Sequence, residues 1–338
     1  MKKTFGIWIA VVFCLILLLA ACGEKSQEDV VKKLEDKLEN MNGYKAEAEM
    51  KMNTGPESLK YQLDIWHKKK DFYRVALKNN QDEKGSQIIL KNEDGVFVLT
   101  PALNKSFKFQ RDWPEKTSQP YLFQSLVQDI VKDKDAEFEV SDSAYIFRTK
   151  TNYQSNNNLP YQEIHIDKKS YTPKLVKVLD KDKNALVEVK FKNFDTNSSF
   201  KDDDFALEKN MTTGTAETTA STNENMGAFT VVLPTETSGS EITEKKQIDL
   251  ENGQRVVMTF EGEKNFTLIE EKQEVVPTLS SPQEVNGEIV NLGHTIGAIS
   301  DNSIEWSSNG MDFYLASKDL TKEELIEVAK SVQGKAVK

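Results

Sequence analysis

YKAEAEMKM, residues 44–52, is the stretch that decides the fold class of this chain. Throughout it, apolar side chains alternate with charged ones at every second position. Successive side chains of a β-strand point to opposite faces of a sheet, so this period gives one apolar face and one solvated face. Sheets with one solvated face are typically antiparallel. We therefore expect residues 44–52 to form a strand of an antiparallel sheet that needs cover on one side.

A helix precedes this strand, and the alternation continues after it. Ser26 followed by Asp29 resembles a capping box, and apolar residues then recur at helical spacing up to Asn42-Gly43. A second helical segment runs from Pro120 to Lys132. These patterns predict one mainly β domain over residues 27–210. Its further strands are expected at residues 59–65, 71–78, 86–91, 95–100, 106–110, 137–140, 145–149, 161–167, 174–179 and 185–193.

A change of composition divides the chain after this domain. Residues 211–225 are dominated by Thr, Ser, Ala, Asn and Glu, which is typical of an interdomain linker. Residues 226–338 are predicted to form a smaller α+β domain, with a hairpin at Asn309-Gly310 and a last helix that opens at Thr321. Its other strands are expected at residues 229–233, 254–260, 265–272, 288–292 and 295–299.

The amino terminus indicates export. Two lysines precede an apolar run, which ends in the small residues of Leu19-Ala20-Ala21-Cys22. This ending resembles the lipobox of bacterial lipoproteins. The resemblance implies that residues 1–21 are a signal peptide, that the Cys22 thiol carries a diacylglyceryl group, and that residues 22–26 form a tether. The alternative is an uncleaved anchor helix. Either way the rest of the chain lies outside the cytoplasm, on the outer face of the membrane.

Composition excludes several classes of partner and site. The formal net charge is -10, so the chain lacks the concentrated positive charge of a nucleic-acid binder. Two cysteines and three histidines are too few for zinc ribbons, iron–sulfur sites or a disulfide framework. We expect no metal and no cofactor other than the acyl lipid on Cys22. Lysine far outnumbers arginine, which favours a Gram-positive bacterium with an AT-rich genome.

Sequence motifs give no catalytic assignment. The chain has no Gly-x-Ser-x-Gly, Ser-x-x-Lys, His-Glu-x-x-His or phosphate-binding Gly-rich loop. Glu163, His165 and Asp167 share one strand face, which fits either a cation site or the solvated side of an amphipathic strand. The run 202–204 of three aspartates fits either a Ca²⁺ ligand or a solvated turn. Trp113-Pro114 fits either a ligand mouth or a loop pinned to the core, whereas Trp306 is expected in the core. We predict a chain that is not an enzyme.

The apolar face of the predicted sheet suggests where a ligand would lie. The helix from Pro120 to Lys132 is placed to cover that face as a lid, and a curved, half-barrel sheet of this kind can enclose a cavity. A plain filled core is the alternative, and the sequence leaves both open. The cavity-lining residues predicted for the sheet and the lid are Leu63, Ile65, Leu122, Phe123, Leu126 and Ile130.

The order of elements and the sequence Asn42-Gly43-Tyr44 after the first helix resemble a known family. The chain is similar to the LolA-like, outer-membrane lipoprotein-sorting superfamily, and within it to the YdcC-like sporulation lipoproteins, whose clostridial counterpart is the germination lipoprotein GerS. The resemblance covers residues 27–209. It implies a curved antiparallel sheet closed by helices around an apolar cavity, which in carriers holds acyl chains. Residues 306–317 and 320–331 resemble a domain of unknown function on Gram-positive surface proteins.

Two functions follow from these observations. The first is a membrane-anchored lipoprotein that binds a protein partner in the cell envelope, in sporulation or germination. The alternative is a binder or carrier of lipid or lipoprotein acyl chains. A tether at Cys22 holds the chain at one membrane, which argues against a diffusing shuttle. An enzyme acting on wall polymer is a third hypothesis, without a paired acid and base to support it.

Overall fold

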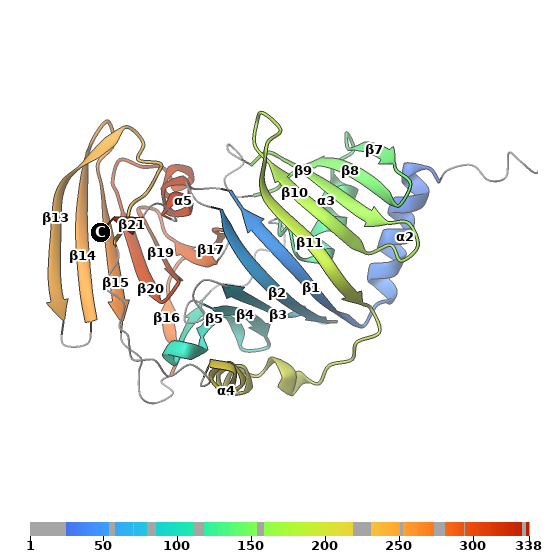
Figure 1. Ribbon diagram of the computed structural model, residues 1–338, viewed down its shortest axis with the longest axis horizontal. Helices are drawn as coiled ribbons and strands as arrows, with labels where there is room; N and C mark the ends of the chain where they lie inside the picture. The colour runs from blue at the N-terminus through green and yellow to red at the C-terminus, as the bar shows by residue number, and fades with distance from the viewer. Residues whose placement is uncertain are drawn as a thin grey trace, which may run out of the picture.

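The chain is mainly β with few helices, and its strands form two large sheets (Figure 1). The computed structural model describes residues 25–53, 58–69, 71–79, 86–110, 118–153, 159–218, 231–250, 253–273, 281–293, 295–332 and 336–337. Within these residues, one sheet has twelve strands, one has seven, and β12 pairs with β21 alone. The expected antiparallel sheets are confirmed, with one parallel pairing; the half-barrel curvature stays a prediction.

The first part of the chain supplies eleven of the twelve strands of the large sheet. The strand order is β16-β6-β5-β4-β3-β2-β1-β11-β10-β9-β8-β7. The elements are α2 (Gln27–Asn40), β1 (Gly43–Met52), β2 (Leu59–Lys68), β3 (Phe72–Asn79), β4 (Gln87–Asn92), β5 (Gly95–Thr100), η2 (Pro101–Leu103), β6 (Lys105–Phe109), α3 (Phe123–Lys132), β7 (Glu137–Val140), β8 (Ala144–Lys150), β9 (Tyr161–Asp167), β10 (Pro173–Leu179), β11 (Ala185–Asp195), η3 (Asp202–Phe205) and α4 (Leu207–Thr218).

The stretch that decided the fold class is β1, and it lies in the middle of the large sheet. It pairs with β2 on one side and β11 on the other, both antiparallel. Its alternating apolar side chains, from Tyr44 to Met52, are all buried. The period-2 pattern therefore predicted both the strand and the face that it buries.

Helices α2 and α3 contact each other and cover this apolar face. The capping residue is the predicted one, since Ser26 Oγ accepts a hydrogen bond from the Asp29 amide at 3.2 Å. Helix α3 begins at Phe123 instead of near Pro120, because the preceding residues form a turn in which the Leu122 amide donates to the Gln119 carbonyl. The helix predicted as a lid is therefore α3, and it packs on the apolar face of the large sheet.

The second large sheet has the order β13-β14-β15-β20-β19-β18-β17 and carries α5 on one face. The predicted hairpin is β19–β20, with Asn309 and Gly310 both at positive φ, as its tight turn requires. The predicted capping box of Thr321 and Glu324 opens α5. The elements are β12 (Val231–Val232), β13 (Ser240–Leu250), β14 (Gly253–Gly262), β15 (Phe266–Gln273), β16 (Gln283–Val285), β17 (Glu288–Asn291), β18 (Ile296–Ile299), β19 (Ser303–Ser308), β20 (Met311–Ala316), α5 (Lys322–Ser331) and β21 (Ala336–Val337).

Part of the predicted linker is helical. Helix α4 occupies residues 207–218, whereas the sequence suggested an irregular connection over 211–225; residues 219–225 lie outside the described residues. Met211 is buried with Phe205 against the outer face of β3, β4 and β5. Asn210 accepts a hydrogen bond from Arg74 Nε at 2.6 Å. These contacts hold a helix whose many Thr residues give it little intrinsic propensity.

The second sheet packs on the first, a point that the sequence left open. Strand β16 adds to the edge of the large sheet, parallel to β6, with Val285 opposite Phe109. Ile289, Ile296 and Ala298 join the same buried cluster as the side chains under α2 and α3. One core therefore extends from the first part of the chain into the second.

Glu270 on β15 generates a prediction about stability and pH. Its side chain is 0% exposed, and its carboxylate accepts from the Val232 amide at 3.0 Å. Burial raises the pKa of Glu270 to about 7, although that hydrogen bond lowers it. An acid with a raised pKa in the folded state loses stability as pH rises from its unfolded pKa towards the folded one. We expect Glu270→Gln to remove this loss, which is on the order of 3 kcal/mol.

Thermal unfolding of the two proteins between pH 5 and pH 8 measures this effect. The variant should gain stability relative to the parent as pH rises, with most of the change complete above pH 7. Parallel curves for the two proteins across this range would show that Glu270 ionises freely in the folded chain.

Candidate functional site

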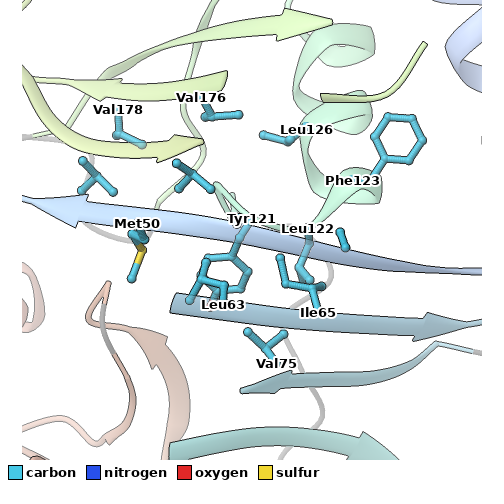
Figure 2. Packing of buried hydrophobic residues seen from close by; sticks show 14 of the residues in the cluster. Met50, Leu63, Ile65, Val75, Tyr121, Leu122, Phe123, Leu126, Val176 and Val178 are labelled. Carbon is cyan, nitrogen blue, oxygen red and sulfur yellow. The ribbon is translucent and has the colours of Figure 1, made fainter. Parts of the chain in front are cut away.

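The side chains predicted to line a cavity lie together in the core. Leu63 and Ile65 on β2 face Leu122, Phe123, Leu126 and Ile130 at α3, and all six are 0–4% exposed. Figure 2 shows Tyr121 beside Leu63, and Val75 and Met50 on the strands belong to the same buried cluster. An acyl chain at this place would have to displace side chains. The assignment of a ligand cavity to these six residues stays a prediction.

The carboxylates considered for cation binding are held by other groups. Glu163 accepts hydrogen bonds from Lys177 at 2.9 Å and Arg148 at 3.1 Å, and lies 2.7 Å from His165 Nε2. Burial raises its pKa, but Lys177 and His165 outweigh burial and lower the pKa of Glu163 to about 2. Asp167 instead caps the turn before β10. Within the described residues, no group of three His, Cys, Asp or Glu side chains is arranged to hold a metal ion.

The other sequence candidates have structural surroundings or lie outside the described part. The aspartates 202–204 form the short helix η3, where Lys68 and Lys209 pair with them. Trp306 is in the core, as expected, and stacks on Phe313 with the ring centroids 5.0 Å apart. Trp113-Pro114 and the lipidation motif Leu19, Ala20, Ala21 and Cys22 lie outside the described residues. No helix in the described ranges is long and apolar enough to cross a membrane.

A cleft of about 370 Å³ lies between the two sheets. Strands β5, β6 and β16 provide one wall, which is mainly apolar: Val98, Phe107, Phe109 and Val285 line it together with Gln283. The opposite side, here called the floor, is the face of the second sheet that does not carry α5. At its β17–β18 end the same face packs into the shared core. The cleft therefore opens where the second sheet stops covering the first.

Strand register arranges the floor in two rows. Arg255, Glu271, Asp312 and Ser307 lie opposite one another across β14, β15, β20 and β19. The next row contains Ile269, Tyr314 and Glu305, in the same strand order from β15 to β19, and ends at Ala298. Tyr314 is 41% exposed, which is high for an aromatic side chain. The floor thus combines a row of charges with a row that contains an open aromatic ring.

Like charges meet in the first row and are compensated from both sides. Glu271 lies directly opposite Asp312, an arrangement that is unfavourable by itself. Arg255 Nε donates to Glu271 at 2.7 Å, and Lys105 from β6 donates to Asp312 at 3.0 Å. Ser307 Oγ also donates to Asp312, at 2.5 Å. The Lys105–Asp312 ion pair therefore joins the two sheets, and its Asp312 lines the cleft.

Glu305 in the second row is different. Its cross-strand neighbours Tyr314 and Ala298 carry no charge, and no hydrogen bond or ion pair to it occurs among the described residues. Partial burial raises the pKa of Glu305, and the negative charge of Asp312 raises it further. The cleft therefore holds one carboxylate whose charge the described part of the protein leaves uncompensated.

Sequence reasoning missed this site. The hairpin around Asn309-Gly310 was predicted. The polar residues on its strands alternate with apolar ones, and this pattern is the one expected of a face exposed to solvent, so it gave no sign of a binding site. Only the pairing of β16 with β6, and of Lys105 with Asp312, turns that face towards another sheet. The site offers carboxylates, a guanidinium, a phenol and apolar walls, a set suited to binding.

The sequence and the fold of the chain are both similar to known proteins. The profile described as "Sporulation protein YdcC-like" matches residues 2–205. The chain is 48% identical over 324 residues to "Sporulation protein YdcC" of Bacillus subtilis (strain 168), which covers 96% of this chain and 95% of that protein. The MucA/MucB complex of Pseudomonas aeruginosa gives a TM-score of 0.34 at 12% identity, over 90% of this chain and 96% of that one. A LolA superfamily protein from Nitrosomonas europaea gives 0.32 at 8% identity, over 55% and 100%.

The packing around α3 predicts a large cost for truncating Leu126. Removal of a fully buried leucine side chain costs about 2–5 kcal/mol when the core around it is filled. We expect Leu126→Ala to lower the free energy of unfolding by that amount in denaturant titrations. Val131→Ala on the same helix, where the side chain is 40% exposed, should change it by less than about 0.5 kcal/mol. An equally small effect at Leu126 would indicate an open cavity there.

The ion pair between the sheets predicts a measurable coupling energy. In a double-mutant cycle of Lys105→Met and Asp312→Asn, we expect about 1–2 kcal/mol of coupling, because both side chains are largely buried. Lys105→Met alone should be the costlier single change, since it leaves Asp312 beside Glu271 without its cation. The exposed pair Lys150–Asp135 is the matched control, with less than about 0.5 kcal/mol expected. Equal coupling in both cycles would mean that the Lys105–Asp312 pair does not hold the sheets together.

Proposed function

Because the chain belongs to the YdcC-like sporulation protein family, we propose that it serves sporulation as a membrane-anchored lipoprotein that binds a protein partner and catalyses no reaction itself. The family membership confirms the resemblance based on element order and the Asn42-Gly43-Tyr44 sequence. The observation that carries the binding role is the cleft between the two sheets, with its apolar wall, charged floor and open Tyr314 ring.

The anchor sets where this binding takes place. Cys22 follows the small residues that resemble a lipobox, and α2 begins only five residues later at Gln27. A diacylglyceryl group on Cys22 carries two acyl chains, and two chains would hold the folded chain stably at the outer face of the cytoplasmic membrane. A short tether keeps the two sheets near the bilayer, where a partner in the envelope is within reach.

The composition of the cleft supports recognition of a protein. Aromatic side chains and arginine are enriched at the centres of protein interfaces, and charges there are arranged to complement the partner. Tyr314 and Arg255 both line the cleft. The acyl-chain alternative would use the core under α3, where the six predicted residues already pack together. The cleft therefore favours a protein partner over a bound lipid.

Site-specific photo-crosslinking tests this proposal in sporulating cells. A benzoylphenylalanine placed at Tyr314 should give one specific crosslinked protein, because the ring is exposed on the cleft floor. The matched control is the same amino acid at Val131, which is almost equally exposed but lies on α3. A product from Tyr314 and none from Val131 supports the proposal. The absence of any product from Tyr314 contradicts it.

The membrane anchor is tested in the same cells. Radioactive palmitate should label the parent protein and should not label the Cys22→Ala variant, since only the Cys22 thiol is expected to be lipidated. Labelling that survives in Cys22→Ala would place the lipid elsewhere, and a parent protein that takes up no label would contradict lipidation.

A further inference from the structure

The uncompensated carboxylate of Glu305 indicates what kind of group is missing from the cleft. A carboxylate that is partly removed from water loses solvation, and it regains stability when a cation approaches. Among the described residues, Arg255, which lines the cleft, is paired with Glu271, and Lys105 beside the cleft is paired with Asp312. Three carboxylates face these two cations, which leaves an excess of negative charge on the floor. The floor is therefore complementary to a basic group.

The wall opposite Glu305 restricts the shape of that basic group. Phe107, Phe109 and Val285 offer apolar surface, which suits the aliphatic stem of lysine or arginine or an apolar side chain. The volume of about 370 Å³ lies at the low end of ligand-binding pockets, so side chains fit here but a folded domain does not. A group that contacts both sides of the cleft must be basic on one side and apolar on the other.

An extended polypeptide segment has this arrangement when basic and apolar residues alternate. Successive side chains of an extended chain point to opposite sides, and those two positions apart lie about 6.6 Å from each other. Glu305 and Ser307, the row positions on β19, are also two residues apart. Basic side chains of such a segment would match the rows of the floor, while the residues between them would contact Phe107 and Val285.

We propose that the cleft binds an extended segment of a protein partner in which basic and apolar residues alternate, with a lysine or arginine side chain paired to Glu305. This inference rests on the proposed function, because it assumes that a protein binds in the cleft. It adds the chemistry of the bound segment and assigns Glu305 as the residue that selects for positive charge.

Peptide binding to the full-length protein in neutral detergent tests the inference. The probe is a fluorescein-labelled peptide of sequence KFKFK, with QFQFQ and EFEFE as controls of equal length, measured by fluorescence anisotropy. We expect KFKFK to bind more tightly than both controls. Glu305→Gln keeps the shape of the side chain and should weaken KFKFK about tenfold, since truncating one partner of a desolvated charge pair is costly. Glu241→Gln, an exposed carboxylate on the same sheet but outside the cleft, should leave binding unchanged.

A charge-reversal variant distinguishes the loss of the Glu305 charge from misfolding of the variant. Glu305→Lys should lose KFKFK and gain EFEFE, a switch that misfolding cannot produce. Equal binding of KFKFK by the parent and by Glu305→Gln, or equal binding of KFKFK and QFQFQ by the parent, overturns the inference. If Tyr314 still crosslinks a partner in cells while KFKFK fails to bind, the proposed function stands and only the basic, alternating segment is refuted. If Tyr314 gives no crosslink, the proposed function itself fails.

Discussion

The apolar face of the large sheet is the constraint on which the rest of this structure depends. A sheet of twelve strands with alternating side chains has far more apolar surface than two short helices can cover. Helices α2 and α3 cover one part, and β17 and β18 of the second sheet cover another through Ile289, Ile296 and Ala298. The second sheet is thus part of the same core. It packs on the large sheet because the apolar face of that sheet has to be shielded from water.

The same constraint creates the cleft. The second sheet contacts the first at one end and leaves it at the other, because its floor changes from apolar residues on β18 to charged residues on β19, β20, β15 and β14. Charged side chains cannot enter the shared core without losing solvation, so the sheets separate where the charges begin. The Lys105–Asp312 ion pair joins the two sheets next to this open space, and Gln87 donates a hydrogen bond to the Ser307 carbonyl beside it. The position of the cleft is therefore encoded in the change from apolar to charged residues along one face.

Sequence patterns predicted those features that depend on local period. The strand at residues 44–52, the capped helices at Ser26 and Thr321, and the hairpin at Asn309-Gly310 each follow from neighbouring residues alone. Strand β13 was missed because residues 241–247 are exposed on both faces and show no alternation. Strand β16 was missed because three residues carry no period, and pairing with β6 defines it. The cleft was missed because its lining side chains, from Val98 to Tyr314, lie far apart in the sequence and no local pattern connects them.

Glu270, which is buried, and Glu305, which is partly buried, show how a structural carboxylate on the second sheet differs from one in a binding site. Burial raises the pKa of both Glu270 and Glu305, and they lie on opposite faces of the sheet. Glu270 is fully buried and has the Val232 amide as its partner, so its carboxylate serves to attach β12. Glu305 faces the open cleft beside a second carboxylate and an exposed aromatic ring. A buried acid with an internal partner contributes to the fold. Glu305 faces the cleft and has no partner among the residues that the structure describes, so it retains its electrostatic attraction for a group from outside.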